Sequence, residues 1–310
     1  MAAPVICCDA LEKRFGDVVA LDRLDLEVPY GQVVGFLGPN GAGKSTTIRI
    51  LLDLARPNGG RVEVLGTDPR AGGPDLRRRI GYVPGELRLD ERLTVEQTLH
   101  SWTRLRGGGV DRAYVDELCE RVQLDPSRHT KGLSSGNRRK VGLVGAFMSR
   151  PELLVLDEPT GGLDPLVQAE FQAMVEEVRD AGATVFLSSH VLSEVQRVAD
   201  HVVVIRRGRA VATGAVDDLR STARQPFTVW FAADPPEAEL RAVPGVSDLV
   251  VRGREVSGVV EGAPAALLAV LGRAPVEHLH WPEPDLEQAF LQLYEDDAPP
   301  MRTRPDEEHE

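Results

Sequence analysis

One short glycine-rich stretch constrains the fold of this chain more than any other feature: Gly38-Pro39-Asn40-Gly41-Ala42-Gly43-Lys44-Ser45-Thr46. It carries the pattern G-x-x-x-x-G-K-[ST], in which a turn without bulky side chains presents successive backbone N–H groups to a phosphate. The apolar residues 33–37 before it predict a buried strand, and residues 46–52 after it predict a helix that packs on a sheet. Because the N-terminus of a helix also attracts anions, the stretch predicts a nucleoside triphosphate site in an α/β fold.

The residue types at this loop and at two later strand ends match the needs of phosphoryl transfer. Lys44 is expected to reach the β- and γ-phosphates, and the Ser45 hydroxyl is expected to complete a Mg²⁺ shell. The apolar run 153–156 predicts a strand covered on both faces, and Asp157 and Glu158 follow it. Ligands of open α/β sheets bind at such strand ends, so we expect Asp157 to bind Mg²⁺, mostly through water, and Glu158 to polarise the attacking water. His190, after the predicted strand 184–189, is expected to contact the γ-phosphate.

The order of predicted elements divides the chain into a large and a small part. Strands alternate with helices across residues 1–220, which predicts a mainly parallel sheet, preceded by strands over 5–9 and 18–28. A helical insert interrupts this core over about 87–150. After a linker over 221–226, short strands and helices over 227–294 predict a small separate α/β domain. The tail 295–310 is acidic and rich in proline, and we expect it to be disordered.

Composition and charge restrict the partners. The chain has 310 residues and a net charge of −12, which argues against general binding of nucleic acid because such binding requires a basic face. Its three cysteines show no metal-ligand spacing, and the neighbours Cys7 and Cys8 suggest thiols in a reducing cytosol. Neither a signal peptide nor an uncharged apolar run long enough for a bilayer is evident. We therefore expect a cytoplasmic protein whose membrane part, if it has one, is another polypeptide.

Several motifs together make the chain resemble the ATP-binding subunits of ABC (ATP-binding cassette) transporters over about residues 5–219. Residues 38–45 match the family's Walker A motif, and residues 153–158 match its Walker B motif and catalytic glutamate. Residues 162–164 match its D-loop, and His190 matches its switch histidine. The segment Leu133-Ser134-Ser135-Gly136-Asn137 matches the signature Leu-Ser-Gly-Gly-Gln, which distinguishes these proteins from other phosphate-loop enzymes. Phe15 falls where the family stacks an aromatic ring on adenine.

The resemblance implies a Mg²⁺-dependent ATPase that works as a pair. In the family the signature faces the nucleotide of the other subunit, so Ser134, Ser135 and Gly136 are expected to act in trans in a head-to-tail dimer that closes on two ATP molecules. The two subunits are either identical or a mixed pair. A separate transmembrane permease is the implied partner, and it would hold the ATPase at the inner face of the cell membrane.

Two departures from the family pattern concern the site. Ser135 and Asn137 replace a Gly and a Gln of the signature, while Ser134 and Gly136 are retained, so contact with the γ-phosphate is expected to survive. After residues 80–84 the family usually has a Gln that touches Mg²⁺ or water, whereas this chain has Gly85 followed by Glu86. Either Glu86 takes over that contact, or the coupling to the membrane partner runs differently.

The last predicted helix suggests the class of transporter. Residues 284–290 resemble the C-terminal extension on ATPases of bacterial drug-, polysaccharide- and lipid-exporting systems, although an unrelated stabilising appendage is the alternative. We therefore expect an ATPase that powers export. A soluble ABC protein that acts on ribosomes or nucleic acid is one alternative, which the acidic charge and the single nucleotide loop disfavour. A nucleotide-gated binding module without turnover is another, which the presence of both Lys44 and Glu158 disfavours but which Gly85 in place of the usual Gln keeps open.

Overall fold

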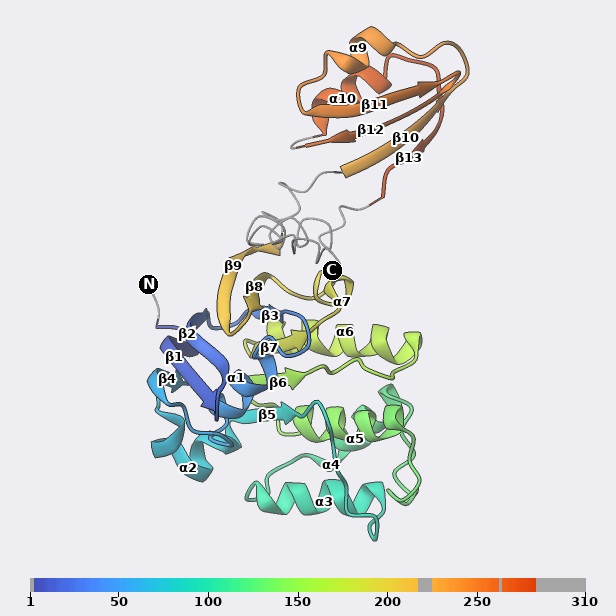
Figure 1. Ribbon diagram of the computed structural model, residues 1–310. Coiled ribbons are helices and arrows are strands. Elements are labelled where there is room, and N and C mark those ends of the chain that lie inside the picture. Colours follow the sequence, from blue (N-terminus) through green and yellow to red (C-terminus); the bar gives the residue numbers. More distant parts are fainter. Residues whose placement is uncertain (1–2, 217–224, 262–263, 283–310) are drawn as a thin grey trace, which may run out of the picture. The chain divides into compact units, whose positions relative to one another are not determined.

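The computed structural model describes residues 3–216, 225–261 and 264–282. The chain separates into two compact units, residues 1–216 and residues 217–310, here called the N-terminal and C-terminal units. Each unit is described by itself (Figure 1). Two predicted segments lie outside the described residues. They are the acidic tail 295–310 and residues 284–290, which resemble the C-terminal extension of exporter ATPases.

The core of the N-terminal unit is a six-stranded sheet in the order β5-β6-β7-β3-β8-β9. Neighbouring strands are parallel except for β9, which runs antiparallel to β8. Every residue of β3, β6 and β7 is buried, as in a sheet that is covered on both faces. This mainly parallel sheet confirms the predicted α/β fold class. The strands span Val33–Leu37 (β3), Ile80–Val83 (β5), Leu153–Asp157 (β6), Thr184–Ser189 (β7), His201–Arg206 (β8) and Arg209–Ala215 (β9).

A second, antiparallel sheet in the order β2-β1-β4 lies beside the core, at the left of the N-terminal unit in Figure 1. Its strands are β1 (Ile6–Phe15), β2 (Val18–Val28) and β4 (Gly59–Val64). Buried residues of this sheet, such as Leu11 and Leu24, share one apolar cluster with Phe36 and Phe186 of the parallel sheet. The predicted first strand ended too early, at residue 9, because β1 continues to pair with β2 as far as Phe15.

Outside the helical insert, the described part of the N-terminal unit contains the helices α1 (Lys44–Leu51), α2 (Pro69–Arg78), α6 (Pro165–Asp180) and α7 (Leu192–Val195). The apolar pattern of the sequence predicts neither α2 nor β9. The apolar pattern of α2 is weak, and the helix contains Gly73 and Pro74, two residues that disfavour helices. Gly73 has φ 53°, outside the helical range. The helix forms nevertheless because Asp68 caps it, accepting a hydrogen bond from the Arg70 N–H at 2.9 Å, and Pro69 occupies its first turn.

The helical insert contains α3 (Val95–Leu105), α4 (Arg112–Arg121) and α5 (Ser135–Phe147), at the lower right in Figure 1. Helix α5 is buried from Lys140 to Phe147 and packs tightly on both sides. A Cβ atom at Gly81 of β5 would lie 2.3 Å from the Ala146 carbonyl oxygen, and one at Gly145 would lie 2.4 Å from the Trp102 ring of α3. Only glycine permits such approaches, so α5 is held between β5 and α3.

The described part of the C-terminal unit is a four-stranded antiparallel sheet in the order β11-β12-β10-β13 with two short helices. Its chain order, β-α-β-β-α-β, is the split β-α-β arrangement, and Phe227, Phe231 and Leu240 belong to its own apolar core. The predicted linker 221–226 ends too late in the sequence, because residues 225 and 226 belong to β10. The elements span Gln225–Phe231 (β10), Glu237–Arg241 (α9), Val246–Arg252 (β11), Glu255–Val260 (β12), Ala265–Leu271 (α10) and Val276–His280 (β13).

None of the helices within the described ranges combines the length and the apolar content needed to cross a bilayer.

Arg121 of the helical insert forms ion pairs with helix α6 of the core. The Arg121 guanidinium of α4 donates to Glu177 of α6 at 2.6 and 2.7 Å and also to Glu170. The Arg121 side chain is only 18% exposed, which makes this pair more than a surface contact. Hydrogen bonds from Arg121 also hold the pKa of Glu177 below its usual range.

We predict that Arg121→Met lowers the free energy of unfolding at pH 7 by about 1 kcal/mol, or roughly 3 °C in Tm. Because the pKa of Glu177 is lowered in the folded state, the stabilisation is present above the unfolded pKa of a glutamate and is lost as the pH falls through the folded value. Thermal melts at pH 7 and at low pH measure the difference, which should shrink on acidification. Arg112→Met, which removes a guanidinium that is 80% exposed, is the control and should stay near wild type at both values. A difference that persists undiminished at low pH would contradict the role of the pair.

Candidate functional site

The glycine-rich loop joins β3 to α1 through backbone that only glycine adopts easily. Gly41 has φ 81° and Gly43 has φ 118°, both in the left-handed half of conformational space. Gly43 is the N-cap of α1, and a Cβ atom there would lie 2.8 Å from the Ala20 carbonyl oxygen. The turn therefore needs glycine at its end, and it brings the loop amides to the N-terminus of α1, where a phosphate is bound most favourably.

Lys44 lies folded across this loop. Its ammonium group donates to the Gly38 carbonyl at 2.6 Å and lies 3.5 Å from a carboxylate oxygen of Glu158. Only 6% of the Lys44 side chain is exposed. Ser45 and Thr46 follow in the first turn of α1, and both are half-buried. The structure thus brings together the lysine and the glutamate that the sequence placed 114 positions apart, 44 against 158.

Asp157 and Glu158 occupy the carboxyl end of β6, where β7 supports both of them. Asp157 pairs in register with Ser188, whose hydroxyl donates to the Asp157 Oδ1 atom at 2.6 Å. The Glu158 N–H donates to the Ser188 carbonyl at 3.1 Å. Glu158 has φ 50°, a conformation that is uncommon for a residue with a side chain and that turns the chain sharply after the strand.

Glu158 is the common partner of the two other predicted catalytic residues. One oxygen of its carboxylate faces Lys44, and the other lies 2.7 Å from Nδ1 of His190. Glu158 is 24% exposed and His190 is 53% exposed, so this end of the group is open to solvent. The arrangement places a carboxylate between a buried cation and an imidazole, at the mouth of the phosphate loop.

The donor set fits Mg²⁺. The Asp157 carboxylate is buried, with 4% exposure, and the Ser45 hydroxyl lies at the start of α1; both are the hard oxygen donors that Mg²⁺ prefers. Within the described part of the chain, no group of three or more His, Cys, Asp or Glu side chains gathers to hold a metal. Mg²⁺ keeps several waters and phosphate oxygens in its shell, so one or two protein oxygens such as those of Asp157 and Ser45 would be enough to hold it.

The loop after β5 lies against the same carboxylates without using Glu86. Glu86 is 81% exposed, and its carboxylate lies 3.6 Å from Arg88. A Cβ atom at Gly85, by contrast, would lie 3.1 Å from the Asp157 Oδ2 atom. The main chain at Gly85 therefore lies close beside Asp157, the residue that the sequence predicts to bind Mg²⁺.

The signature residues form a block with the D-loop of the same chain. Ser134 caps α5, and its hydroxyl accepts a hydrogen bond from the Asn137 N–H at 3.2 Å. Gly136 approaches the Gly162 carbonyl so closely that a Cβ atom at Gly136 would lie 2.4 Å from that oxygen. One turn later, Lys140 pairs with Asp164 at 3.6 Å. Ser134 and Ser135 are exposed, so these hydroxyls are available to a second molecule.

Phe15, the predicted adenine-stacking residue, ends β1 with 51% of its surface exposed. The Lys13 ammonium lies 4.8 Å from the centroid of its ring. An exposed aromatic ring beside a cation is suited to stack on a base.

Two residues that support the site were not predicted from the sequence. Ser188 holds both Asp157 and Glu158, and a polar residue at the end of the strand beside β6 was the signal that would have identified it. Arg139 donates to the carbonyls of Pro84 and Gly85, and no motif or spacing in the sequence indicates this contact.

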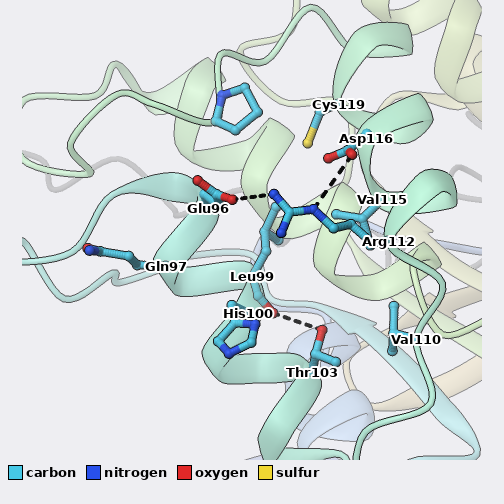
Figure 2. A pocket seen from close by; sticks show the side chains of 11 residues that line it. Glu96, Gln97, Leu99, His100, Thr103, Val110, Arg112, Val115, Asp116 and Cys119 are labelled. Carbon is cyan, nitrogen blue, oxygen red and sulfur yellow. Dashed lines mark hydrogen bonds and ion pairs between the residues drawn. The ribbon is translucent and has the colours of Figure 1, made fainter.

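A separate cavity of about 280 Å³ lies in the helical insert, and Figure 2 shows it. Leu99 and Thr103 of α3 and Val115 and Cys119 of α4 line it, and Arg112 crosses it toward Glu96 and Asp116. It contains none of the predicted nucleotide-binding or catalytic residues.

Comparison with known proteins agrees with this geometry. A family model described as "ABC transporter" matches residues 21–161. A daunorubicin resistance ATP-binding protein of Streptomyces coeruleorubidus is 44% identical over 71% of this chain and 71% of its own. A Nod factor export ATP-binding protein of Cupriavidus pinatubonensis is 35% identical over 91% of this chain and 88% of its own. A solved structure of an ATP-binding subunit of an ABC transporter is 31% identical, with a TM-score of 0.64 over 70% of this chain and 92% of that one. The phosphate loop, the strand-end carboxylates and these similarities together show that the chain belongs to the ABC transporter family, as one of its ATP-hydrolysing ATP-binding subunits.

Proposed function

We propose that two copies of this subunit, or one copy and a related one, close head to tail on two ATP molecules and power export through a separate transmembrane permease. The relatives named for daunorubicin resistance and Nod factor export support an exporter whose substrate is of the drug, lipid or polysaccharide class. The permease would hold the subunit at the inner face of the cell membrane. The contact of Glu158 with both Lys44 and His190 is the observation that carries the catalytic part of this proposal.

The contacts of Lys44 suggest how nucleotide binding prepares the site. The phosphates would lie against the backbone amides of the loop from Asn40 to Ser45, and the Lys44 ammonium would exchange Gly38 and Glu158 for phosphate oxygens. This exchange frees one oxygen of the Glu158 carboxylate, while His190 keeps hold of the other. Glu158 then polarises a water molecule and accepts its proton as the water oxygen attacks the γ-phosphorus and the bond to the bridging oxygen breaks, giving ADP and phosphate. Mg²⁺, held by Asp157 and Ser45 when bound, supplies charge stabilisation of the phosphates.

The signature block supports a site completed by a second molecule. The described contacts of Ser134 and Gly136 are with Asn137 and Gly162, both in the signature and D-loop region of the same chain. Its exposed hydroxyls and the positive end of α5 are therefore free to meet the γ-phosphate of a partner. Binding of ATP would bring two protomers together, and hydrolysis would release them.

We predict that Glu158→Gln keeps ATP affinity, lowers kcat about 100-fold or more because the general base is lost, and accumulates a dimer with ATP. Lys44→Ala should weaken ATP binding about 10-fold or more, since a charge-assisted contact with the phosphates is removed. Steady-state turnover, equilibrium binding and light scattering after gel filtration measure these effects.

Glu152→Gln is the matched control for this pair of variants. Glu152 precedes β6 and pairs with Arg79 on the surface, so its substitution should leave turnover near the wild-type value. Wild-type turnover in Glu158→Gln would exclude the catalytic role of Glu158, and unchanged ATP affinity in Lys44→Ala would exclude the role of the lysine.

We predict that a negative charge at Ser134 blocks dimerisation without weakening ATP binding by the monomer. Aspartate and asparagine both cap helices well, so Ser134→Asp and Ser134→Asn should fold alike. In the Glu158→Gln background, Ser134→Asp should bind ATP with unchanged affinity and remain monomeric, because its carboxylate would face the γ-phosphate of the partner. Ser134→Asn should still form the dimer. Weaker ATP binding by the Ser134→Asp monomer would instead place the signature in cis.

A further inference from the structure

The Arg139 side chain of α5 reaches two segments of the catalytic edge, the loop after β5 and the end of β6. Its Nη1 atom donates to the Pro84 carbonyl at 2.6 Å, and its Nη2 atom donates to the Gly85 carbonyl at 2.8 Å. The same Nη1 atom lies 3.4 Å from the carbonyl of Asp157. The planar, forked shape of a guanidinium allows one side chain to bind carbonyls from a loop and a strand end at once, which the single point charge of a lysine does not.

The hydrogen bonds of this guanidinium within the described residues all go to backbone carbonyls. Arg139 is half-buried, and burial lowers the pKa of its guanidinium, while the charges of Asp157 and Glu158 oppose that effect. Carbonyl partners fix the position of a main chain, whereas a carboxylate partner would fix only another side chain. Arg139 therefore acts on the course of the backbone at residues 84, 85 and 157.

The main chain that Arg139 binds at Gly85 lies next to the Asp157 carboxylate, which is predicted to bind the metal. A Cβ atom at Gly85 would lie 3.1 Å from the Asp157 Oδ2 atom, so the main chain at Gly85 forms one wall of that site. A Cβ atom at Gly161, in the segment leading to the D-loop, would lie 3.8 Å from the Arg139 Nη2 atom. Arg139 is thus placed among the loop after β5, the end of β6 and the approach to the D-loop.

Helix α5 connects these contacts to the signature. Ser134 caps the helix, Gly136 touches Gly162, and Arg139 projects from the same N-terminal part of the helix. A rigid helix moves as one piece, so a shift of the signature also shifts the guanidinium that spans residues 84, 85 and 157.

We propose that Arg139 is a positioning residue that holds the loop after β5 against the carboxyl end of β6 and so sets the Asp157–Glu158 pair according to the position of α5. This inference rests on the proposed ATPase function. Movement of the insert would be transmitted to the catalytic edge through the guanidinium, and the exposed Glu86 would have no part in it.

The test compares three full-length variants. Arg139→Met removes the guanidinium and keeps an apolar stem, Arg139→Lys keeps the charge without the fork, and Arg138→Met removes the neighbouring, exposed arginine as a matched control. The measurements are the Kd for ATP in EDTA, kcat at saturating ATP and Mg²⁺, and hydrogen exchange of the peptide that contains residues 84–87.

We expect Arg139→Met to keep its Kd for ATP within about 2-fold, because the phosphate loop is untouched. Its kcat should fall about 10- to 100-fold, as expected for misplaced catalytic groups, and residues 84–87 should exchange faster. Arg139→Lys should recover only part of the lost kcat, and Arg138→Met should match the wild type in all three measurements.

Each of three results would overturn the proposal. They are a kcat of Arg139→Met near the wild-type value, full recovery of kcat by Arg139→Lys, and an equal loss of bound ATP and kcat. The last outcome would indicate only a smaller folded fraction. Absence of turnover in the wild-type protein would instead overturn the proposed function. Exchange of residues 84–87 would then decide the inference, and unchanged exchange in Arg139→Met would overturn it.

Discussion

The parallel register of β3, β6 and β7 is the constraint on which the rest of this structure depends. Asp157 pairs with Ser188, and Leu37 pairs with Ser189, so all three strands end at one level. The loop after β3 supplies the amides and Lys44, the end of β6 supplies two carboxylates, and the end of β7 leads to His190. A slip of the register would separate these groups, and the apolar residues that bury both faces of the strands prevent it.

Close backbone contacts extend this edge into the helical insert. The main chain of α5 approaches β5 at Gly81 and the D-loop at Gly136, in both cases to distances that exclude a Cβ atom. Such contacts leave no side chain to rearrange, so a displacement of α5 is passed on as a displacement of its neighbours. Lys140 and Asp164 add an ion pair at the same boundary. The insert and the catalytic edge are consequently linked mechanically as well as by sequence.

The sequence revealed the parts of the site whose residues are neighbours in the chain. The glycine-rich loop and the Asp157–Glu158 pair are each local patterns, and strand–loop–helix context placed them correctly on the fold. Arg139 was not predictable because its partners lie more than 50 positions away, at residues 84 and 85, and because backbone carbonyls carry no sequence signal. Strand β9 was missed since its alternating small residues give little apolar contrast, and β1 was cut short because its far end, Phe15, is exposed.

The sharing of Glu158 between Lys44 and His190 explains why binding and catalysis are joined in one place. A buried ammonium needs a negative partner, and here the general-base candidate serves as that partner. Under the proposed function, a phosphate that neutralises Lys44 would remove the reason for this contact, so the event that fills the loop would also release the carboxylate. The strained backbone of Glu158, at φ 50°, keeps its side chain at the mouth of the loop while the partners change. Another carboxylate near Lys44 would neutralise its charge equally well. Only the pairing with Glu158 itself would make release of the general base depend on bound ATP.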